Sequence, residues 1–173
     1  LVLRELVEPR GLWAMLVTVC QQRAFAMCDR VAVLLNGRIQ HLDVPSNLYR
    51  DPANRSVAGC VGQGGFIPGT ALGPDTIESE LGVIHGNRAD RWESGTLVDV
   101  LTRPDDIVHA PNSDLQPKVV EKTFAGPSTL YRFRFSEDTE FEALFRRHLY
   151  FNLGGHCPVR VEADHLIAFE RTS

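Results

Sequence analysis

From residue 63 onward the sequence repeats one texture: short alternating segments of polar and apolar residues, separated by turn residues. In the clearest segment Tyr131, Phe133 and Phe135 alternate with two arginines, the period expected of a half-buried strand. Many short strands with Gly and Pro turns between them predict a small barrel or sandwich. The strands that we expect cover residues 81–85, 96–101, 116–124, 128–135, 140–145 and 158–162.

One of these segments allows a second interpretation. Residues 139–147 could instead form an amphipathic helix, because Phe141, Leu144 and Phe145 would then share one face. In either conformation we expect these apolar side chains to belong to the core.

Residues before 63 follow a different pattern. Trp13 to Val19 is a continuous apolar run that predicts a strand buried on both faces. A helix should follow over residues 21–29, then a second buried strand over 31–35. Asn36-Gly37 predicts a hairpin that returns along residues 38–42. This order is typical of the edge region of an α/β sheet.

Two short helices should follow, with Ser46 and Asn54 as their N-caps. The cluster Gly62-Gln63-Gly64-Gly65 then separates the two textures. We therefore predict two domains, residues 1–62 and 63–173.

Composition and charge argue against several classes of protein. The chain has 173 residues and a net charge of −4, and no apolar run approaches the roughly 20 residues of a membrane-spanning helix. We find no signal-peptide pattern at the N-terminus. The sequence does not begin with Met, so we expect a piece of a longer chain. Residues 1–60 carry 7 Lys+Arg and 5 Asp+Glu, whereas the remainder carries 11 and 17. The acidic second part argues against a dedicated nucleic-acid binder.

The cysteines and histidines give weak candidates for chemistry. Cys20, Cys28, Cys60 and Cys157 form no C-x-x-C pair, so we expect reduced, mostly buried thiols. Cys20 could be a nucleophile, but a thiol at the end of a strand is the better interpretation. His148, His156 and Cys157 could bind a metal, although adjacent side chains in a strand point to opposite faces.

The first 62 residues contain a series of segments that resembles the end of the ATPase domain of an ABC importer. Five segments match in order and at nearly the standard spacing of that family. They are TVCQQRA at residues 18–24, CDRVAVL at 28–34, NGRI at 36–39, PSNLYRDPANR at 45–55 and VAGCVG at 57–62.

The rest of the chain resembles the regulatory domain of the same importers, a TOBE-type barrel related to the OB fold. Residues 103–107 (RPDDI) match its R-P-E-D-I turn, and residues 164–169 (DHLIAF) resemble its closing strand. Residues 65–70 and 72–76 look like the ferric-iron importer branch. The resemblance therefore implies a mainly β fold, an OB-like (TOBE) barrel preceded by an α/β remnant of an ABC ATPase domain.

Several parts of that ATPase are missing from the sequence. It has no G-x-x-x-x-G-K-[ST] phosphate loop and no L-S-G-G-Q segment. The full-length family uses ATP and Mg, but we expect no cofactor and no ATP hydrolysis from this chain alone. The family's switch His falls at Val19, whose isopropyl group can neither donate nor accept a hydrogen bond. Cys20 and Arg23 likewise replace acidic residues of the family pattern.

The resemblance implies a non-catalytic regulatory and dimerisation region. The parent protein would couple ATP hydrolysis to import of a solute, which the resemblance of residues 65–76 implies to be ferric iron. It would work with membrane permease subunits, as a cytoplasmic protein on the inner face of the membrane. We expect a homodimer and no nucleic-acid partner. The alternative is a barrel that senses a small ligand, such as an oxyanion, a sugar or a metal.

Two groups of residues are candidates for such a role. Arg103, Asp105 and Asp106 could form ion pairs between subunits, or belong to a turn that Pro104 fixes. Ser128 and Thr129, after Gly126-Pro127, could contribute hydroxyl donors to an anion site. Arg132 and Arg134 could serve a nucleic-acid platform, but their aromatic neighbours should point the other way, into the barrel.

Overall fold

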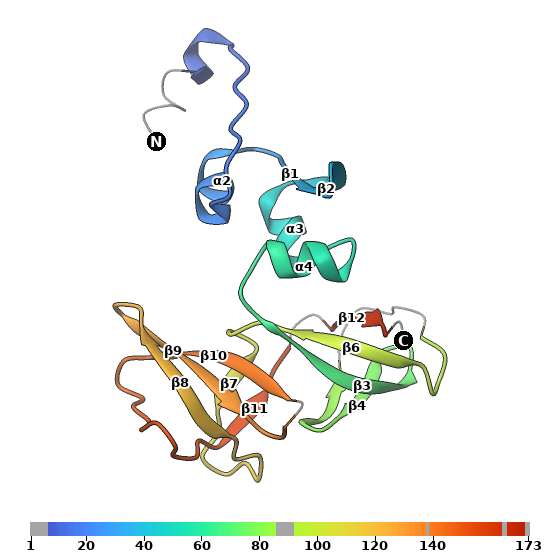
Figure 1. The fold of residues 1–173 in the computed structure, drawn as a ribbon, viewed down its shortest axis with the longest axis vertical. Helices are drawn as coiled ribbons and strands as arrows, with labels where there is room; N and C mark the ends of the chain where they lie inside the picture. Colours follow the sequence, from blue (N-terminus) through green and yellow to red (C-terminus); the bar gives the residue numbers. More distant parts are fainter. Residues whose placement is uncertain (1–6, 86–91, 138, 164–165, 172–173) are drawn as a thin grey trace. The chain divides into compact units, whose positions relative to one another are not determined.

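The computed structural model describes residues 7–85, 92–137, 139–163 and 166–171. The chain divides into two compact units, Leu1–Gly62 and Gln63–Ser173. The first contains most of the helices and the second contains most of the strands (Figure 1). Each unit has hydrophobic clusters of its own.

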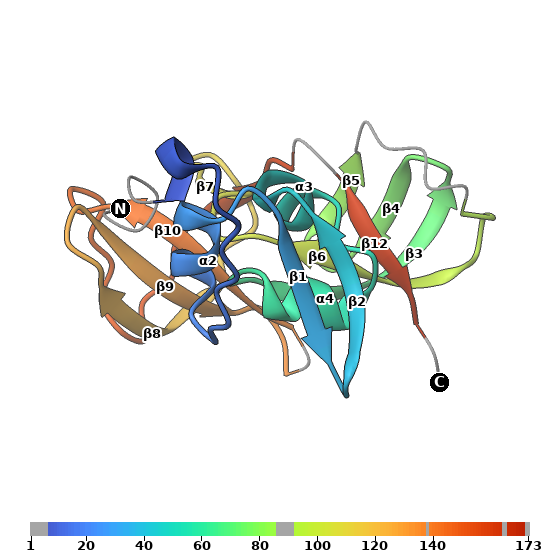
Figure 2. The same ribbon diagram turned by 90° about the horizontal axis from the view of Figure 1, so that it is seen from above.

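Unit 1 is built on a β-hairpin and short helices. Its elements are η1 (Glu8–Arg10), α2 (Gln21–Met27), β1 (Val31–Leu35), β2 (Arg38–Asp43), α3 (Pro45–Arg50) and α4 (Arg55–Cys60). Figure 2 shows β1 and β2 side by side, joined by a tight turn. Asn36 and Gly37 have φ angles of 52° and 73°, the left-handed pair that the predicted hairpin requires. Val33, Leu48, Val57 and Val61 form its core.

The two predicted helix caps differ in outcome. The Asn54 side chain accepts a hydrogen bond from the backbone N–H of Val57 at 2.9 Å, so this cap is confirmed. The prediction for Ser46 is wrong: α3 begins two residues earlier than expected, with Val44 as the N-cap and Pro45 in its first turn. Proline suits that position because its missing N–H would have no partner in the helix there.

The predicted strand at Trp13–Val19 is also wrong. The segment contains no strand, and its side chains lie in the open, with Trp13, Met15 and Val19 at 101%, 92% and 107% exposure. A strand needs a neighbour for its backbone hydrogen bonds, and the only sheet that unit 1 forms in its described residues is the β1–β2 pair. The expected edge of an α/β sheet is therefore reduced here to a hairpin.

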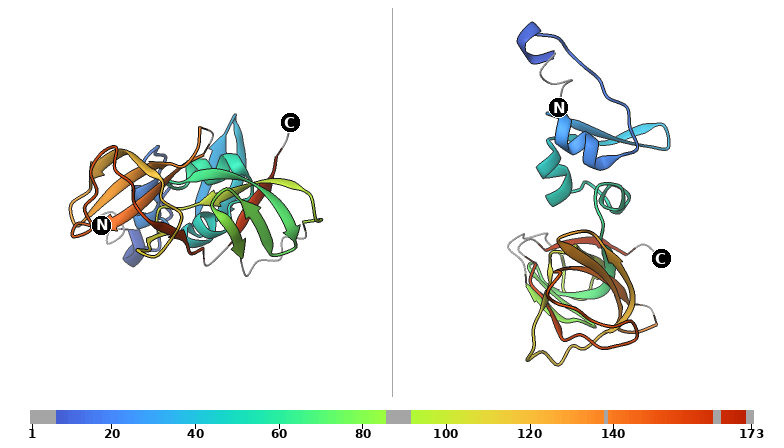
Figure 3. Two further views of the ribbon diagram at one scale, coloured as in Figure 1. Left: turned by 90° about the horizontal axis from the view of Figure 1, so that it is seen from below. Right: turned by 90° about the vertical axis from the view of Figure 1, so that its left-hand side faces the viewer.

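The described residues of unit 2 form three sheets. The five-stranded sheet has the order β12-β6-β3-β4-β5, the three-stranded sheet β10-β9-β8, and a further pair β11-β7. The right-hand view of Figure 3 shows these strands curving around a common interior. The strands are β3 (Gly65–Gly73), β4 (Thr76–Ser79), β5 (Gly82–His85), β6 (Leu97–Thr102), β7 (Ile107–His109), β8 (Lys118–Phe124), β9 (Ser128–Arg134), β10 (Glu140–Arg146), β11 (Val159–Val161) and β12 (Ile167–Glu170).

All six predicted strands overlap strands of the structure, and residues 140–146 are a strand rather than a helix. The sequence patterns missed β3, β4 and β7. The predicted closing strand corresponds to β12, but Asp164 and His165 lie outside the described residues.

Aromatic rings fill the main core of unit 2. Tyr131, Phe133 and Phe141 are at most 1% exposed, and their neighbours Phe145 and Phe151 stack at centroid distances near those of favourable ring pairs. The Tyr131 hydroxyl donates to the Leu149 carbonyl and accepts from the Phe151 N–H, both at 3.3 Å. The one buried polar group of these rings is thereby satisfied within the core.

We predict that Phe133→Ala lowers the free energy of unfolding by about 3–5 kcal/mol, because it removes a fully buried ring. Phe124, which is 74% exposed, is the control, and Phe124→Ala should change stability by less than about 0.5 kcal/mol. Urea denaturation followed by circular dichroism measures both. Equal losses for the two variants would contradict this description of the core.

Candidate functional site

The turn between β6 and β7 is closed by its own residues. The Asp106 carboxylate accepts a hydrogen bond from the Arg103 N–H at 2.7 Å. In the other direction, the Asp106 N–H donates to the Arg103 carbonyl at 3.0 Å. Residues 103–106 therefore form a turn, which is the second of the two interpretations that the sequence allowed.

The Arg103 side chain is turned inward. It is 6% exposed, and its Nη1 donates to the Gln63 carbonyl at 3.1 Å. Beside it Gly64 has a φ of 151°, and a Cβ at that position would lie 2.4 Å from the Thr102 carbonyl oxygen. Arg103 thus holds the first residues of unit 2 against the end of β6, whereas Asp105 lies exposed at the surface.

The same turn connects distant parts of unit 2. The Pro104 carbonyl accepts from the Leu144 N–H at 3.0 Å, and the Asp106 carbonyl accepts from the Glu162 N–H at 2.7 Å. Residues 103–106 therefore link β6, β10 and the segment after β11. Of the three candidates in this turn, the surface position of Asp105 suits contact with another subunit best.

The second candidate pair lies at the start of β9. Ser128 and Thr129 are half-buried and follow a turn in which the Ala125 N–H donates to the Ser128 carbonyl at 2.9 Å. Strand register places Arg146 opposite Ser128. The next residue, Arg147, donates its N–H to the Pro127 carbonyl at 3.2 Å. The register thus places Arg146 on the same face as Ser128, whereas Thr129 lies on the opposite face with Phe145, and the backbone of Arg147 adjoins the turn. Sequence analysis missed both arginines.

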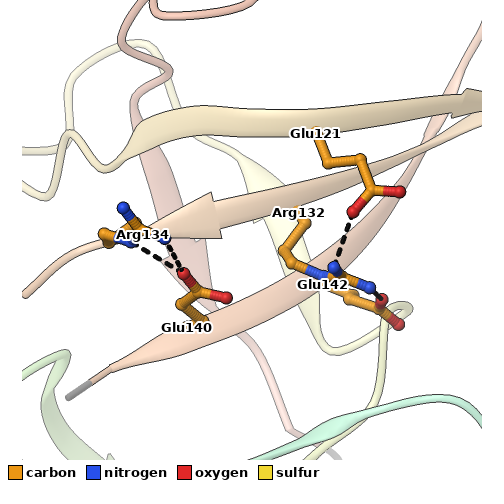
Figure 4. Close-up of polar contacts among 5 residues, drawn as sticks. All are labelled: Glu121, Arg132, Arg134, Glu140 and Glu142. Carbon is orange, nitrogen blue, oxygen red and sulfur yellow. Dashed lines mark hydrogen bonds and ion pairs between the residues drawn. The ribbon is translucent and has the colours of Figure 1, made fainter. Parts of the chain in front are cut away.

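Arg132 and Arg134 form ion pairs with carboxylates on the outer face of the three-stranded sheet (Figure 4). Arg132 contacts Glu121 at 2.6 Å and Glu142 at 3.2 Å, and Arg134 contacts Glu140 at 2.6 Å. The hydrogen bond that Arg132 donates to Glu142 and the negative charge of Glu121 raise the pKa of Arg132. These ion pairs join neighbouring strands, so the two arginines stabilise the pairing of β9 with β8 and β10.

The aromatic neighbours of these arginines fit the same conclusion. Tyr131 and Phe133 lie in the core, as predicted, although Phe135 is 40% exposed. A stacking platform for bases would need exposed rings and free cations on one face. The absence of a nucleic-acid partner stays a prediction, and this geometry is consistent with it.

The cysteine and histidine candidates do not converge. Burial raises the pKa of Cys157 to about 12, which keeps its thiol protonated and unreactive. His156 instead contacts the Gln116 carbonyl through Nδ1 at 2.8 Å. In the parts of the chain that the structure describes, no group of three or more His, Cys, Asp or Glu residues could hold a metal ion.

Cys20 is not the strand-end thiol that we expected, because the strand is absent. It precedes α2 as its N-cap residue, with its N–H donating to the Thr18 hydroxyl at 3.0 Å. All four cysteines are free, but only Cys157 is buried, so the expectation of mostly buried thiols is wrong. Among the described helices none is long and apolar enough to cross a membrane.

Comparison with known proteins shows a clear relationship. The chain is 38% identical over 137 residues to the spermidine/putrescine import ATP-binding protein PotA of Marinobacter nauticus, covering 74% of this chain and 36% of that protein. It is 36% identical over 118 residues to the sulfate/thiosulfate import ATP-binding protein CysA of Xanthomonas campestris, covering 68% of this chain and 33% of that protein. The chain thus spans about a third of the length of these curated relatives. No family model matches the chain.

A solved structure supports the fold class. The cytoplasmic molybdate-binding protein ModG, crystallised with molybdate bound, is similar with a TM-score of 0.50, covering 61% of this chain and 95% of that chain. The sequence identity is 12%, so the likeness concerns the fold alone. The predicted fold class, mainly β with an OB-like (TOBE) barrel, is confirmed. The ferric-iron branch gains no support from these relatives.

We predict that Asp106→Ala lowers the free energy of unfolding by about 1–2 kcal/mol, because the Arg103 N–H loses its charged acceptor. Asp106→Asn keeps an acceptor oxygen and should lose less. Asp114→Ala, at an exposed position in a neighbouring loop, is the control and should have little effect. Urea denaturation ranks the three variants. A loss for Asp114→Ala as large as that for Asp106→Ala would contradict the role of the turn.

A second prediction concerns pH. The Glu80 carboxylate, in the turn between β4 and β5, accepts from the Ser136 hydroxyl at 2.7 Å, and that hydrogen bond lowers the pKa of Glu80 from its ordinary value of 4.5. A depressed folded-state pKa stabilises the fold fully above the unfolded pKa, and this contribution is lost as pH falls through the folded pKa. Below about pH 4.5 we therefore expect the melting temperature of the native chain to fall more steeply than that of Glu80→Gln.

Ser136→Ala serves as the matched control for the pH prediction, because it removes the donor and leaves the carboxylate. Its melting temperature between pH 7 and pH 3 should fall less steeply than that of the native chain and more steeply than that of Glu80→Gln, because Thr139 also lowers the pKa of Glu80. Parallel profiles for the native chain and both variants would show that this hydrogen bond contributes nothing to the pH dependence.

Proposed function

The chain belongs to the ATP-binding proteins of ABC importers and corresponds to their C-terminal part, and from this premise we propose that it is a non-catalytic regulatory and dimerisation region. Unit 1 would be the end of the ATPase domain, and unit 2 the regulatory barrel. The chain lacks the phosphate loop and the signature segment, so we propose that ATP and Mg are bound outside it.

One observation carries this proposal. The match to PotA of Marinobacter nauticus covers 74% of the chain, so the unmatched residues are fewer than either unit contains. The similarity must therefore include residues of both units. A stand-alone barrel with chance similarity to an ATPase would match in one unit only.

The proposal extends to the parent protein. It would couple ATP hydrolysis to solute import together with membrane permease subunits, as a cytoplasmic protein at the inner face of the membrane. Relatives named for a polyamine and for sulfate match at 38% and 36% identity. We infer that this part of the protein does not choose the solute, because a cation and an anion would demand different contacts.

Unit 1 has an exposed apolar segment, Trp13 to Val19. Trp13, Met15, Val17 and Val19 are each at least 89% exposed, and a contiguous apolar stretch of this kind is stable in water only when another surface buries it. We propose that further strands of an ATPase domain normally bury this segment. In the isolated chain a second copy would take their place.

We predict that residues 1–173 and residues 63–173 both form dimers, measured by light scattering on size-exclusion chromatography. The barrel itself would then hold two subunits together, as the proposal requires. If residues 63–173 are monomeric while the full chain is oligomeric, the uncovered segment of unit 1 drives association, and the dimerisation role is wrong.

A second candidate function is the sensing of a small anion. It is favoured by the arrangement at the start of β9, where Arg146 lies opposite Ser128 and Arg147 contacts the neighbouring turn. Hydroxyl groups and guanidinium groups are the donors that such an anion needs. A thermal shift of several degrees with one oxyanion and none with others would support sensing over dimerisation alone.

A further inference from the structure

One row of residues crosses the whole five-stranded sheet of unit 2. Figure 1 shows β6, β3 and β4 of this sheet side by side. The register places Thr70 of β3 opposite Leu97 of β6 on one side and opposite Glu78 of β4 on the other. Glu78 in turn lies opposite Val83 of β5. At the other end the Arg171 N–H donates to the Leu97 carbonyl at 3.0 Å, just beyond β12. We name these five residues, Arg171, Leu97, Thr70, Glu78 and Val83, the cross-strand row.

The cross-strand row lies on the outer face of the sheet. Val98 and Ile77, the sequence neighbours of Leu97 and Glu78, are fully buried in a core cluster of unit 2. Because successive side chains of a strand point to opposite faces, those of Leu97 and Glu78 point away from this core. Leu97 is 59% exposed, and Glu78 and Arg171 are exposed as well. The row is therefore accessible to another surface.

The row also contains apolar area that a partner could bury. On the described strands of this sheet the exposed large apolar residues are Leu72, Val83 and Leu97. Two of them belong to the row, and Leu72 is two residues from Thr70 along β3. Removing such side chains from water stabilises an association in proportion to the apolar area that is buried.

Opposite charges lie at equal distances from the centre of the row. The centre falls between β6 and β3, so Arg171 and Glu78 each occupy the second position from it. Three strand spacings of about 4.8 Å keep their backbones about 14 Å apart, with Leu97 and Thr70 between them. Among the described residues Glu78 has no ion pair, and the ion pair of Arg171 with Asp99 is 3.8 Å long, too long for a hydrogen bond. Neither charge therefore satisfies the other within one chain.

We propose that two copies of unit 2 pack face to face at the cross-strand row, around a twofold axis that runs parallel to the strands between β6 and β3. This axis brings Arg171 of each copy to Glu78 of the other copy. It also brings Leu97 of each copy to Thr70 of the other, so the same surface contacts itself, as a twofold interface requires. The inference rests on the proposed dimerisation role and deepens it by naming the surface that two subunits share.

The arrangement of charge selects a second copy among the possible occupants of this face. Related by the axis, the two rows form two ion pairs and leave no like charges opposite each other. An acidic or a basic partner would instead meet one repulsive charge beside each attractive one. Sheets that pack face to face lie about 10 Å apart, a gap that the long side chains of Arg171 and Glu78 together span.

The test measures the dissociation constant of the dimer of the full chain by sedimentation equilibrium. Glu78→Arg places arginines opposite each other at both ends of the contact, and Arg171→Glu places glutamates there. We expect each variant to weaken the dimer at least about tenfold, because like charges across an interface repel. An equimolar mixture of the two variants should recover the native affinity, because each end of the mixed dimer again pairs an arginine with a glutamate.

Matched controls keep the test specific. Asp114→Arg and Arg147→Glu make the same changes of charge at exposed positions outside the five-stranded sheet, and they should dimerise like the native chain. Leu97→Asp tests the centre of the row and should weaken the dimer at least about tenfold. Circular dichroism confirms that each variant is folded. Because Arg171→Glu also alters the contact with Asp99, Glu78→Arg and Leu97→Asp decide the test if that variant is unfolded.

Three outcomes would overturn the proposal. If the native chain is a dimer and Glu78→Arg and Leu97→Asp dissociate no more than the controls, two copies meet elsewhere, and the dimerisation role survives without this surface. If the mixture of charge variants dissociates as readily as each variant alone, Arg171 and Glu78 do not face each other. A monomeric native chain would refute the dimerisation role itself, and this inference with it.

Discussion

The arrangement of unit 2 depends on the hydrogen bonds of one four-residue turn. Asp106 closes the turn through the Arg103 N–H, and Pro104 and Asp106 offer their carbonyls to Leu144 and Glu162. The turn therefore joins β6 to β10 and to the segment that leads from β11 toward β12. Because Arg103 is buried and also holds the Gln63 carbonyl, it fixes the point where the chain enters the barrel. A single short motif thus sets the relative positions of the two larger sheets.

The sequence predicts the strands of unit 2 well because their alternation directly reflects burial. Tyr131 and Phe133 point inward and Arg132 points outward, as a period of two requires. The strand β3 escapes prediction because Gly65, Pro68 and Gly69 interrupt its pattern. Gly69 has a physical reason to be there, since a Cβ would lie 2.6 Å from the Ile77 side chain. Such close approach cannot be predicted from one strand alone, because it depends on the neighbouring one.

In unit 1 the sequence predicts turns and caps correctly but predicts a strand that does not form. The apolar run from Trp13 to Val19 has the composition of a buried strand. A strand of this kind forms only where neighbouring strands pair with it, and composition does not show whether such strands are present. Asn36-Gly37 and Asn54 are predicted correctly because turns and caps are satisfied within a few residues. Local devices are therefore predictable here, whereas a strand that depends on distant partners is not. The candidate site has the same limit, since Arg146 meets Ser128 only through the pairing of two strands.

The arginines of the three-stranded sheet differ in the residues that lie opposite them. Arg132 lies between Glu121 and Glu142 on the neighbouring strands. Its ion pairs with them stabilise the register of β8, β9 and β10. Arg146 lies on the same face of β10 as Glu142, four residues further along, where the opposite residue is Ser128 rather than a carboxylate. Had the strand ended with another structural pair, an acidic residue at position 128 would have sufficed. With a serine there, Arg146 has no carboxylate opposite it in the register, in contrast to Arg132, which lies between Glu121 and Glu142.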